Sequence, residues 1–310
     1  MCGIVGYVGF RPAAPILLGG LERLEYRGYD SAGIAVLNGE GEVFVEKVAG
    51  KLDSLVSLAR ERLPEGHVGI AHTRWATHGK PTVSNAHPHL DCRGEVIVIH
   101  NGIVENYRSL KEKLLARGHK LASETDSEVI AHLVEERSAQ NTHLEEAVRE
   151  ALVEVEGAYA ILVTSVREPD KIVAARAGNA GGIVVGYSEG EMYLASDLSA
   201  IVPYTQRAVF LENGDLAAVG PWGARYFNKR GEGLDREPKR VSHAEVSVAK
   251  EGYKHFMLKE IMEQPRALTS ALRGRLGFDP PEIFLEQFPF SQSDLAKIDR
   301  VVLVGMGTSL

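Results

Sequence analysis

The sequence predicts an α+β fold in which antiparallel sheets are layered with helices. Short runs rich in β-branched residues recur along the chain, and turn-forming pairs such as Asn38-Gly39 and Asn213-Gly214 separate several of them. Such pairs favour β-hairpins over helical crossovers, so the sheets should be antiparallel. Helical patterns with apolar residues three or four positions apart lie between the runs.

The predicted strands begin next to the N-terminus. They cover Gly3–Val8, Gly33–Leu37, Val43–Val48, Val68–Ala71, Val96–His100, Ala158–Thr164, Ile172–Ala175, Ile183–Gly186, Met192–Ala195 and Ala208–Leu211. Three apolar stripes predict helices that face a core. They consist of Leu17, Leu21 and Leu24; of Tyr107, Leu110 and Leu114, ending at Gly118; and of Leu144, Val148 and Leu152.

The C-terminal part of the chain has a different character. Residues 228–253 are charged and aperiodic, which predicts a linker that could contain one strand, after a first domain at 1–227. A helix is expected over Phe256–Arg273, where Pro265 should end or kink it. The segment Val301–Val304 resembles a buried strand, and one strand cannot complete a parallel sheet. We therefore expect residues 254–310 to be the start of a second, truncated domain.

Composition restricts the class of protein. The 310 residues are 44% hydrophobic and 25% charged, and the formal charge of −7 gives no electrostatic reason to bind nucleic acid or an anionic membrane. Two cysteines cannot build a disulfide framework, and a free thiol favours a reducing compartment. No signal peptide or membrane-spanning run is apparent, so we expect a cytoplasmic protein.

Cys2 is the most informative residue, because it directly follows the initiator Met. Removal of that Met would leave a thiol and a free amine on one residue. An α-amine has a pKa of about 7.7 to 8, so at neutral pH it can accept the thiol proton and no distant histidine is required. The alternative is that Cys2 is a small apolar residue whose position has no catalytic meaning.

An Arg-containing run could hold a carboxylate. In His72–Gly79, the planar fork of Arg74 matches a carboxylate and the hydroxyl of Thr77 can add a donor. Arg74 could equally form a structural ion pair. Trp75 could cover a pocket or simply pack as an aromatic side chain.

Two further motifs offer oxyanion and ammonium contacts. Asn101 and Gly102 end a β-branched run, and an amide N–H beside a backbone N–H is what an oxyanion hole requires. The same dipeptide is more often just a turn. Asp126 could pair with an ammonium group, while Thr125 and Glu128 have the spacing of a capping box at a helix start.

A metal site is not expected. Five histidines are close in sequence, but no cysteine pair, HExxH motif or carboxylate set accompanies them: His67, His72, His78, His87 and His89. We therefore expect no metal and no cofactor. A thiol with its own base, a carboxylate clamp, oxyanion donors and an ammonium clamp make a site for an amide-bearing α-amino acid, of which L-glutamine is the obvious example.

The motifs resemble the glutaminase domain of class II glutamine amidotransferases. The resemblance covers nearly the whole chain and six motifs in order: Met1–Gly6, Arg27–Gly33, His72–Gly79, Asn85–Pro88, His100–Gly102 and Glu124–Asp126. Three segments are similar in sequence to the family branch that transfers ammonia to fructose 6-phosphate in amino-sugar biosynthesis: Glu25–Ser31, Lys259–Pro265 and Gly307–Ser309.

The resemblance implies an N-terminal-nucleophile hydrolase fold, a four-layer αββα sandwich of antiparallel sheets, followed by the truncated start of an α/β sugar-isomerase domain. It implies that the thioester nucleophile is Cys2 and that Asn101 and Gly102 form the oxyanion hole. The residues that hold the substrate would be Arg74, Thr77 and Asp126. Trp75 and His78 would belong to a loop that covers the site, and Arg27 and Gly28 to its wall. In the second domain, Thr308 and Ser309 would belong to a sugar-phosphate loop.

The implied activity is hydrolysis of L-glutamine to glutamate and ammonia. Because most of the isomerase half is absent, this chain should not make glucosamine 6-phosphate alone, and it could be a monomer although the longer family members are expected to be homodimers. One alternative is a glutaminase that serves another acceptor, such as phosphoribosyl pyrophosphate or an aspartyl-adenylate. Another is a non-catalytic module that binds an amino acid or a sugar phosphate and regulates a partner.

Overall fold

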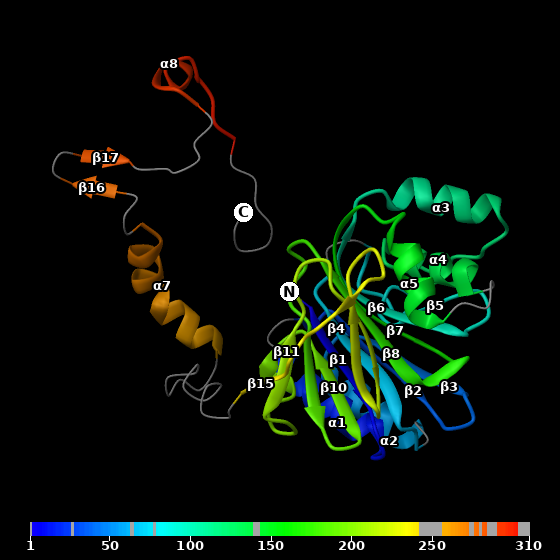
Figure 1. Cartoon of the computed structure of the whole chain (residues 1–310). Helices are drawn as coiled ribbons and strands as arrows, with labels where there is room; N and C mark the ends of the chain where they lie inside the picture. Colours follow the sequence, from blue (N-terminus) through cyan, green and yellow to red (C-terminus); the bar gives the residue numbers. More distant parts are fainter. Residues whose placement is uncertain are drawn as a thin grey trace. The chain divides into compact units, whose positions relative to one another are not determined.

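The computed structural model describes residues 2–25, 28–62, 65–76, 79–138, 143–241, 256–272, 276–278, 281–283 and 290–302. It divides into two compact units, Met1–Ala249 and Lys250–Leu310 (Figure 1). The predicted domain and linker boundaries at residues 227 and 253 stay predictions.

Two antiparallel sheets form the first unit. The eight-stranded sheet has the order β15 (Lys239–Arg240), β11 (Arg207–Phe210), β9 (Val184–Ser188), β10 (Glu191–Ala195), β1 (Gly3–Val8), β4 (Val68–Arg74), β2 (Ser31–Leu37), β3 (Val43–Ala49). The seven-stranded sheet has the order β14 (Gly233–Leu234), β13 (Gly223–Phe227), β12 (Leu216–Gly220), β8 (Glu168–Ala177), β7 (Gly157–Ser165), β6 (Val96–Val104), β5 (His89–Leu90).

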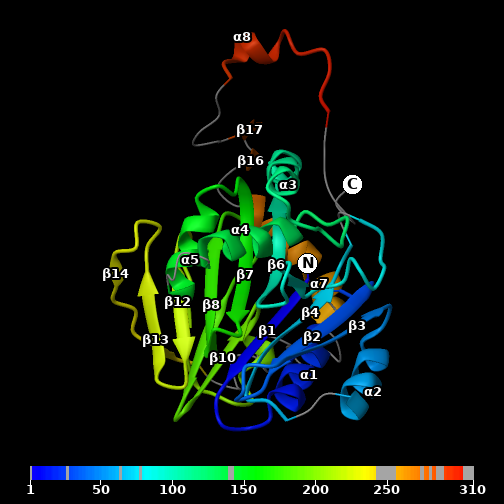
Figure 2. The same ribbon diagram turned by 90° about the vertical axis from the view of Figure 1, so that its right-hand side faces the viewer.

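Helices cover the outer faces of both sheets (Figure 2). Helices α1 (Ala13–Leu24) and α2 (Leu52–Arg62) pack with β1 and β2 in one buried apolar cluster. Helices α3 (Tyr107–Ala116), α4 (Glu128–Ser138) and α5 (Leu144–Leu152) pack with β6, β7 and β8 in a second. A third cluster lies between the sheets and joins β1, β2 and β4 of the first sheet to β6, β7, β8 and β12 of the second. The predicted four-layer αββα arrangement is thereby confirmed.

The alternation of side chains along β1 shows how one strand serves two cores. Val5 and Tyr7 belong to the cluster under α1, whereas Ile4 and Val8 belong to the cluster between the sheets. Successive side chains of a strand point to opposite faces, so a strand between two apolar layers must be apolar at every position. This explains the continuous apolar runs in the sequence.

Most predicted elements are confirmed, within one to a few residues at their ends. The hairpin at Asn38-Gly39 joins β2 to β3 as predicted. The prediction of a hairpin at Asn213-Gly214 is wrong. The preceding β11 pairs with β9 in one sheet, whereas the following β12 pairs with β8 and β13 in the other. Helix α2, the strands β5, β12 and β13, and a 3₁₀ turn at Leu198–Ala200 were not predicted from the sequence. The described part of residues 228–253 contains two short strands, β14 and β15, where the sequence allowed one.

The second unit contains α7 (Phe256–Leu272), β16 (Leu276–Phe278), β17 (Pro281–Ile283) and α8 (Gln292–Leu295). Helix α7 does not end at Pro265, which lies inside it. Val301 and Val302 are not in a strand, and the rest of the predicted terminal strand lies outside the described residues. Among the described residues, no helix is both long and apolar enough to span a bilayer.

Candidate active site

Strand register and side-chain alternation bring the candidate residues to one end of the sandwich. In β4, Val68 and Ile70 point between the sheets, so His72 and Arg74 share that face. Gly3 pairs with Thr73 and Ile4 with His72, which places Cys2 beside the end of β4. In β6, Ile97 and Ile99 point inward from the opposite sheet. Asn101 has the same parity and therefore faces the end of β1.

Cys2 is half-buried and contacts the backbone that follows β4. The N–H of Trp75 donates to the Cys2 Sγ at 3.1 Å, and the Sγ lies 3.6 Å from the carbonyl oxygen of Trp75. Burial raises the pKa of the Cys2 thiol, while the Trp75 N–H and the charge of Arg74 oppose this shift. The sulfur therefore rests as a thiol and needs a base to become a nucleophile.

Asn101 is fixed between Cys2 and His72. Its Nδ2 donates to the carbonyl oxygen of Cys2 at 3.0 Å, and its Oδ1 lies 2.9 Å from the Nε2 of His72. Burial lowers the pKa of His72 to about 3, so the ring is neutral and its Nε2–H donates to the amide oxygen. This contact turns the amide nitrogen toward Cys2. The second hydrogen on Nδ2 stays available for a ligand.

Gly102 follows Asn101 in a conformation that side chains disfavour. Its φ is 134°, and a Cβ at this position would lie 2.0 Å from the carbonyl oxygen of Ala158. A glycine is therefore required where β6 passes β7. Gly102 itself is exposed, unlike Asn101 beside it.

Arg74 is buried among backbone carbonyls and acidic groups. Its guanidinium donates to the carbonyl oxygens of Gly79 at 3.2 Å and Lys80 at 3.3 Å. Burial lowers its pKa, and Cys2, Asp126 and Asp30 act in the opposite direction. The carbonyl contacts hold the guanidinium in place, and its planar fork has the geometry that matches a carboxylate.

Asp126 lies at the start of α4 and is buried. Its Oδ2 accepts the N–H of Val104 at 2.8 Å, which ties the carboxylate to the end of β6. The expected capping box is not formed. Glu128 accepts the N–H groups of Ala122 and Ser123, both at 2.7 Å, because the chain folds back before the helix and presents these donors instead.

The remaining predicted residues fall into two groups. Gly28 packs against the backbone of Arg74, where a Cβ would lie 2.8 Å from the carbonyl carbon. Trp75 stacks edge to face with Tyr29 at a ring-centroid distance of 5.6 Å. Five lie outside the described residues: Arg27, Thr77, His78, Thr308 and Ser309.

Two residues near Cys2, His72 and Asp30, have contacts that the sequence did not predict. The Oδ2 of Asp30 accepts the N–H of Ala76 at 2.7 Å and so holds the loop that begins at Trp75. Asp30 lies in a quoted motif, but the motif does not reveal this contact. The only sequence signal for His72 was its position in a strand that ends beside Cys2.

Residues 72–203 match the family model described as a glutamine amidotransferase domain. The glutamine–fructose-6-phosphate aminotransferase (isomerizing) of Pyrococcus horikoshii is 44% identical over 310 residues, which are 100% of this chain and 50% of that protein. A protein of the same name from Thermus thermophilus is 48% identical over 309 residues, again 100% and 50%. The chain thus spans about half the length of these curated relatives.

Two solved structures are similar in fold. The glutamine phosphoribosylpyrophosphate amidotransferase of B. subtilis matches with a TM-score of 0.62 and 25% identity, over 74% of this chain and 49% of that one. The structure described as the allosteric regulatory enzyme of purine biosynthesis matches with a TM-score of 0.63 and 26% identity, over the same shares. These matches confirm the predicted fold class.

Proposed function

This chain carries a class II glutamine amidotransferase domain, and from that premise we propose that it hydrolyses L-glutamine to glutamate and ammonia through a thioester on Cys2. One observation supports this assignment most directly. The Nδ2 of Asn101 donates to the Cys2 carbonyl at 3.0 Å, so an oxyanion donor and a thiol lie side by side. An acyl-transfer site requires this pair.

The proposed reaction has two steps. After removal of Met1, the Cys2 amine takes the thiol proton, and the sulfur attacks the δ-carbonyl carbon of glutamine. Asn101 Nδ2–H and the Gly102 N–H hold the negative oxygen, the C–N bond breaks, and the proton passes from the amine to the departing nitrogen, which leaves as ammonia. Water then attacks the thioester, releasing glutamate and restoring the thiol.

Substrate binding is assigned to the charges around Cys2. Arg74, with Thr77, would bind the α-carboxylate, and Asp126 would bind the α-ammonium group. Arg74 and Asp126 are buried and held by backbone contacts at 2.8 to 3.3 Å, which would preorganise them for an amino acid. Trp75 would belong to the covering loop with His78, and Arg27 and Gly28 to the wall of the site.

The wider activity belongs to the same proposal. The names of the relatives describe an aminotransferase that acts on glutamine and fructose 6-phosphate. We assign this chain to the same reaction, as part of a longer protein. There the ammonia would convert fructose 6-phosphate to glucosamine 6-phosphate, residues 254–310 would open the isomerase domain, and Thr308 and Ser309 would contact the sugar phosphate. A cytoplasmic location and a homodimer of the longer protein are part of this proposal.

The deciding experiment measures glutamate release from the chain and from Cys2→Ala. Alanine is also small, so removal of Met1 should proceed in both proteins. We expect the variant to fold with an unchanged circular dichroism spectrum and to release no glutamate. Glutamate release by Cys2→Ala at the unmodified rate would exclude a thioester on this residue.

A second measurement addresses the amine. Intact mass should show a chain that begins at Cys2 and gains one adduct with a glutamine-analogue electrophile. A chain that keeps Met1 and still turns over at full rate would show that the Cys2 amine is not the base. Glutamate release measured with and without fructose 6-phosphate should be equal if the glutaminase step is autonomous.

A further inference from the structure

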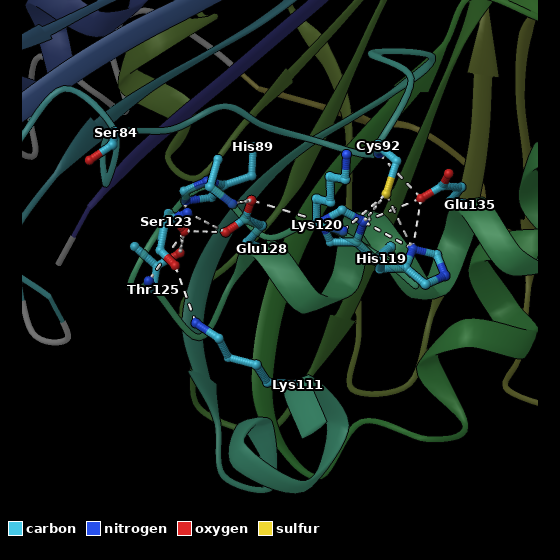
Figure 3. Close-up of polar contacts among 12 residues, drawn as sticks. Ser84, His89, Cys92, Lys111, His119, Lys120, Ser123, Thr125, Glu128 and Glu135 are labelled. Carbon is cyan, nitrogen blue, oxygen red and sulfur yellow. Dashed lines mark hydrogen bonds and ion pairs between the residues drawn. The ribbon is translucent and has the colours of Figure 1, made fainter. Parts of the chain in front are cut away.

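Four side chains that could ligate a metal meet on the helix side of the seven-stranded sheet. Cys92 follows β5, His119 lies in the loop between α3 and α4, and His132 and Glu135 stand one helical turn apart on α4. The ligand atoms of all four lie within 4.8 Å of one another. Figure 3 shows Cys92, His119 and Glu135 pointing toward one another from these separate elements. No residue of the candidate active site belongs to this group.

The distances between these atoms have the pattern of a tetrahedral zinc site. The Sγ of Cys92 lies 3.5 Å from the Nδ1 of His119 and 3.5 Å from the Nδ1 of His132, and the two Nδ1 atoms are 3.3 Å apart. The Oε2 of Glu135 lies 3.0 and 3.2 Å from the same nitrogens. A tetrahedron with Zn–N near 2.0 Å and Zn–S near 2.3 Å has N–N and N–S edges of about 3.3 and 3.5 Å.

Hydrogen bonds alone do not account for this arrangement. A ring nitrogen has a single in-plane position for a hydrogen bond, either as donor or as acceptor. The Nδ1 of His119 nevertheless has three close neighbours, the Sγ of Cys92 and the ring nitrogen of His132 and the carboxylate of Glu135. One cation at their centre would satisfy all of these atoms at once.

The surroundings supply the outer contacts of a metal site. Both rings direct Nδ1 inward and Nε2 toward a carboxylate: His119 Nε2 lies 3.3 Å from Glu136 and His132 Nε2 lies 3.8 Å from Glu128. The 3.3 Å contact of Glu136 is within hydrogen-bond distance and would orient His119 as a ligand, whereas Glu128 lies beyond hydrogen-bond distance and acts on His132 through its charge. The N–H of Lys120 approaches the Cys92 Sγ at 3.4 Å, as a donor to a thiolate would.

Charge and access are also consistent with zinc. A Cys thiolate and a Glu carboxylate together neutralise a divalent cation, and two neutral imidazoles complete four ligands. Sulfur and nitrogen ligands favour zinc over magnesium or calcium. His119 and Glu135 line a cleft of about 500 Å³ and Cys92 is exposed, so three of the four residues border on solvent.

We propose that Cys92, His119, His132 and Glu135 bind one Zn²⁺ ion in a structural role. Four protein ligands leave no open position for a substrate, which is typical of a structural site. The ion would join the turn after β5, the loop after α3 and helix α4. Glu128, which lies behind His132, also binds Ser123 in the segment that carries Asp126, so the ion would stiffen the support of that carboxylate.

The test measures metal binding and does not depend on glutaminase activity. The full 310-residue chain, without a histidine tag, is stripped with a chelator and titrated with Zn²⁺ and with Co²⁺. We expect one equivalent of each metal to bind and the Co²⁺ form to show a thiolate-to-cobalt charge-transfer band. Cys92→Ala should lose that band and stoichiometric binding, because Cys92 is exposed and its replacement leaves the core intact.

Matched controls separate this cluster from other thiols and imidazoles. Cys2→Ala should bind metal like the unmodified chain. His119→Gln should lose stoichiometric binding, whereas His143→Gln, whose side chain is 73% exposed, should keep it. Zn²⁺ should raise the melting temperature of the unmodified chain and leave that of Cys92→Ala unchanged. Absence of stoichiometric binding by the unmodified chain, or equal binding by Cys92→Ala, would overturn the proposal.

Discussion

Replacing Asn101 by alanine tests whether its amide is the oxyanion donor. The Nδ2 of Asn101 is held by the Cys2 carbonyl at 3.0 Å and the Oδ1 by His72 at 2.9 Å, so the donor is preorganised. Loss of one such donor costs about 2.7 to 4 kcal/mol in the transition state. At about 1.36 kcal/mol for each factor of ten, kcat should fall by about 10² to 10³.

The assay is steady-state glutamate release, with kcat and KM determined separately. KM should change much less than kcat, because the oxyanion forms only in the transition state. The variant will also be less stable, since His72 and the Cys2 carbonyl each lose a buried partner at a cost of about 1 to 3 kcal/mol. Activity must therefore be measured well below the melting temperature.

Asn106→Ala is a matched control for the loss of a structural asparagine. Asn106 also donates through Nδ2, to the Glu154 carbonyl at 2.8 Å, and accepts the N–H of Glu156 at 3.1 Å, but it does not contact Cys2. We expect lower stability and an unchanged kcat. If Asn101→Ala keeps its kcat, or if both variants lose kcat equally, the oxyanion role of Asn101 is refuted.

Three other residues give predictions of the same kind. Asp126→Asn preserves an acceptor for the Val104 N–H but removes the charge, so KM for glutamine should rise at least about tenfold with little change in kcat; an unaltered KM would leave Asp126 a purely structural residue. Gly102→Ala would place a Cβ 2.0 Å from the Ala158 oxygen at a φ of 134°, and should cost about 1 to 3 kcal/mol of stability or more; a melting temperature equal to that of the unmodified chain would contradict this. Burial lowers the pKa of His72 to about 3, against about 6.5 in the unfolded chain. Between these two pH values the unfolded chain binds a proton on this ring and the folded chain does not. The free energy of unfolding should therefore fall as the pH drops from about 6.5 toward 3. The loss from this group is on the order of 2 kcal/mol at pH 5, measured by urea unfolding at pH 7 and pH 5, and equal values at the two pH values would be evidence against a neutral buried ring.

Sequence patterns were sufficient for elements whose burial is periodic. The stripes of α1 and α5 were predicted because their apolar residues repeat every three or four positions and these residues are buried. Helix α2 was missed although Leu52, Leu55 and Ala59 have helical spacing and are buried, because most of the other residues of that helix are charged residues or serines. A short apolar stripe in a polar segment carries too weak a signal.

The turn at Asn213-Gly214 shows a different limit. The dipeptide does adopt turn geometry, with a φ of 91° at Gly214. A turn, however, does not determine which strands pair after it. The pairing of β11 and β12 is decided by which sheet offers each strand an apolar face, and that information is spread over the whole chain.

The sequence by itself determined which reactive groups the chain carries: a thiol at position 2, an Asn-Gly pair, an arginine and an aspartate. Because the reactivity of these residue types is local, the sequence was enough to predict the kind of chemistry. Only the tertiary structure decided their geometry. Asn101 reaches Cys2 because two strands on opposite sheets present the same parity at one end of the sandwich. The cluster of Cys92, His119, His132 and Glu135 became visible in the same way, because only the folded chain brings a turn, a loop and a helix face to one point.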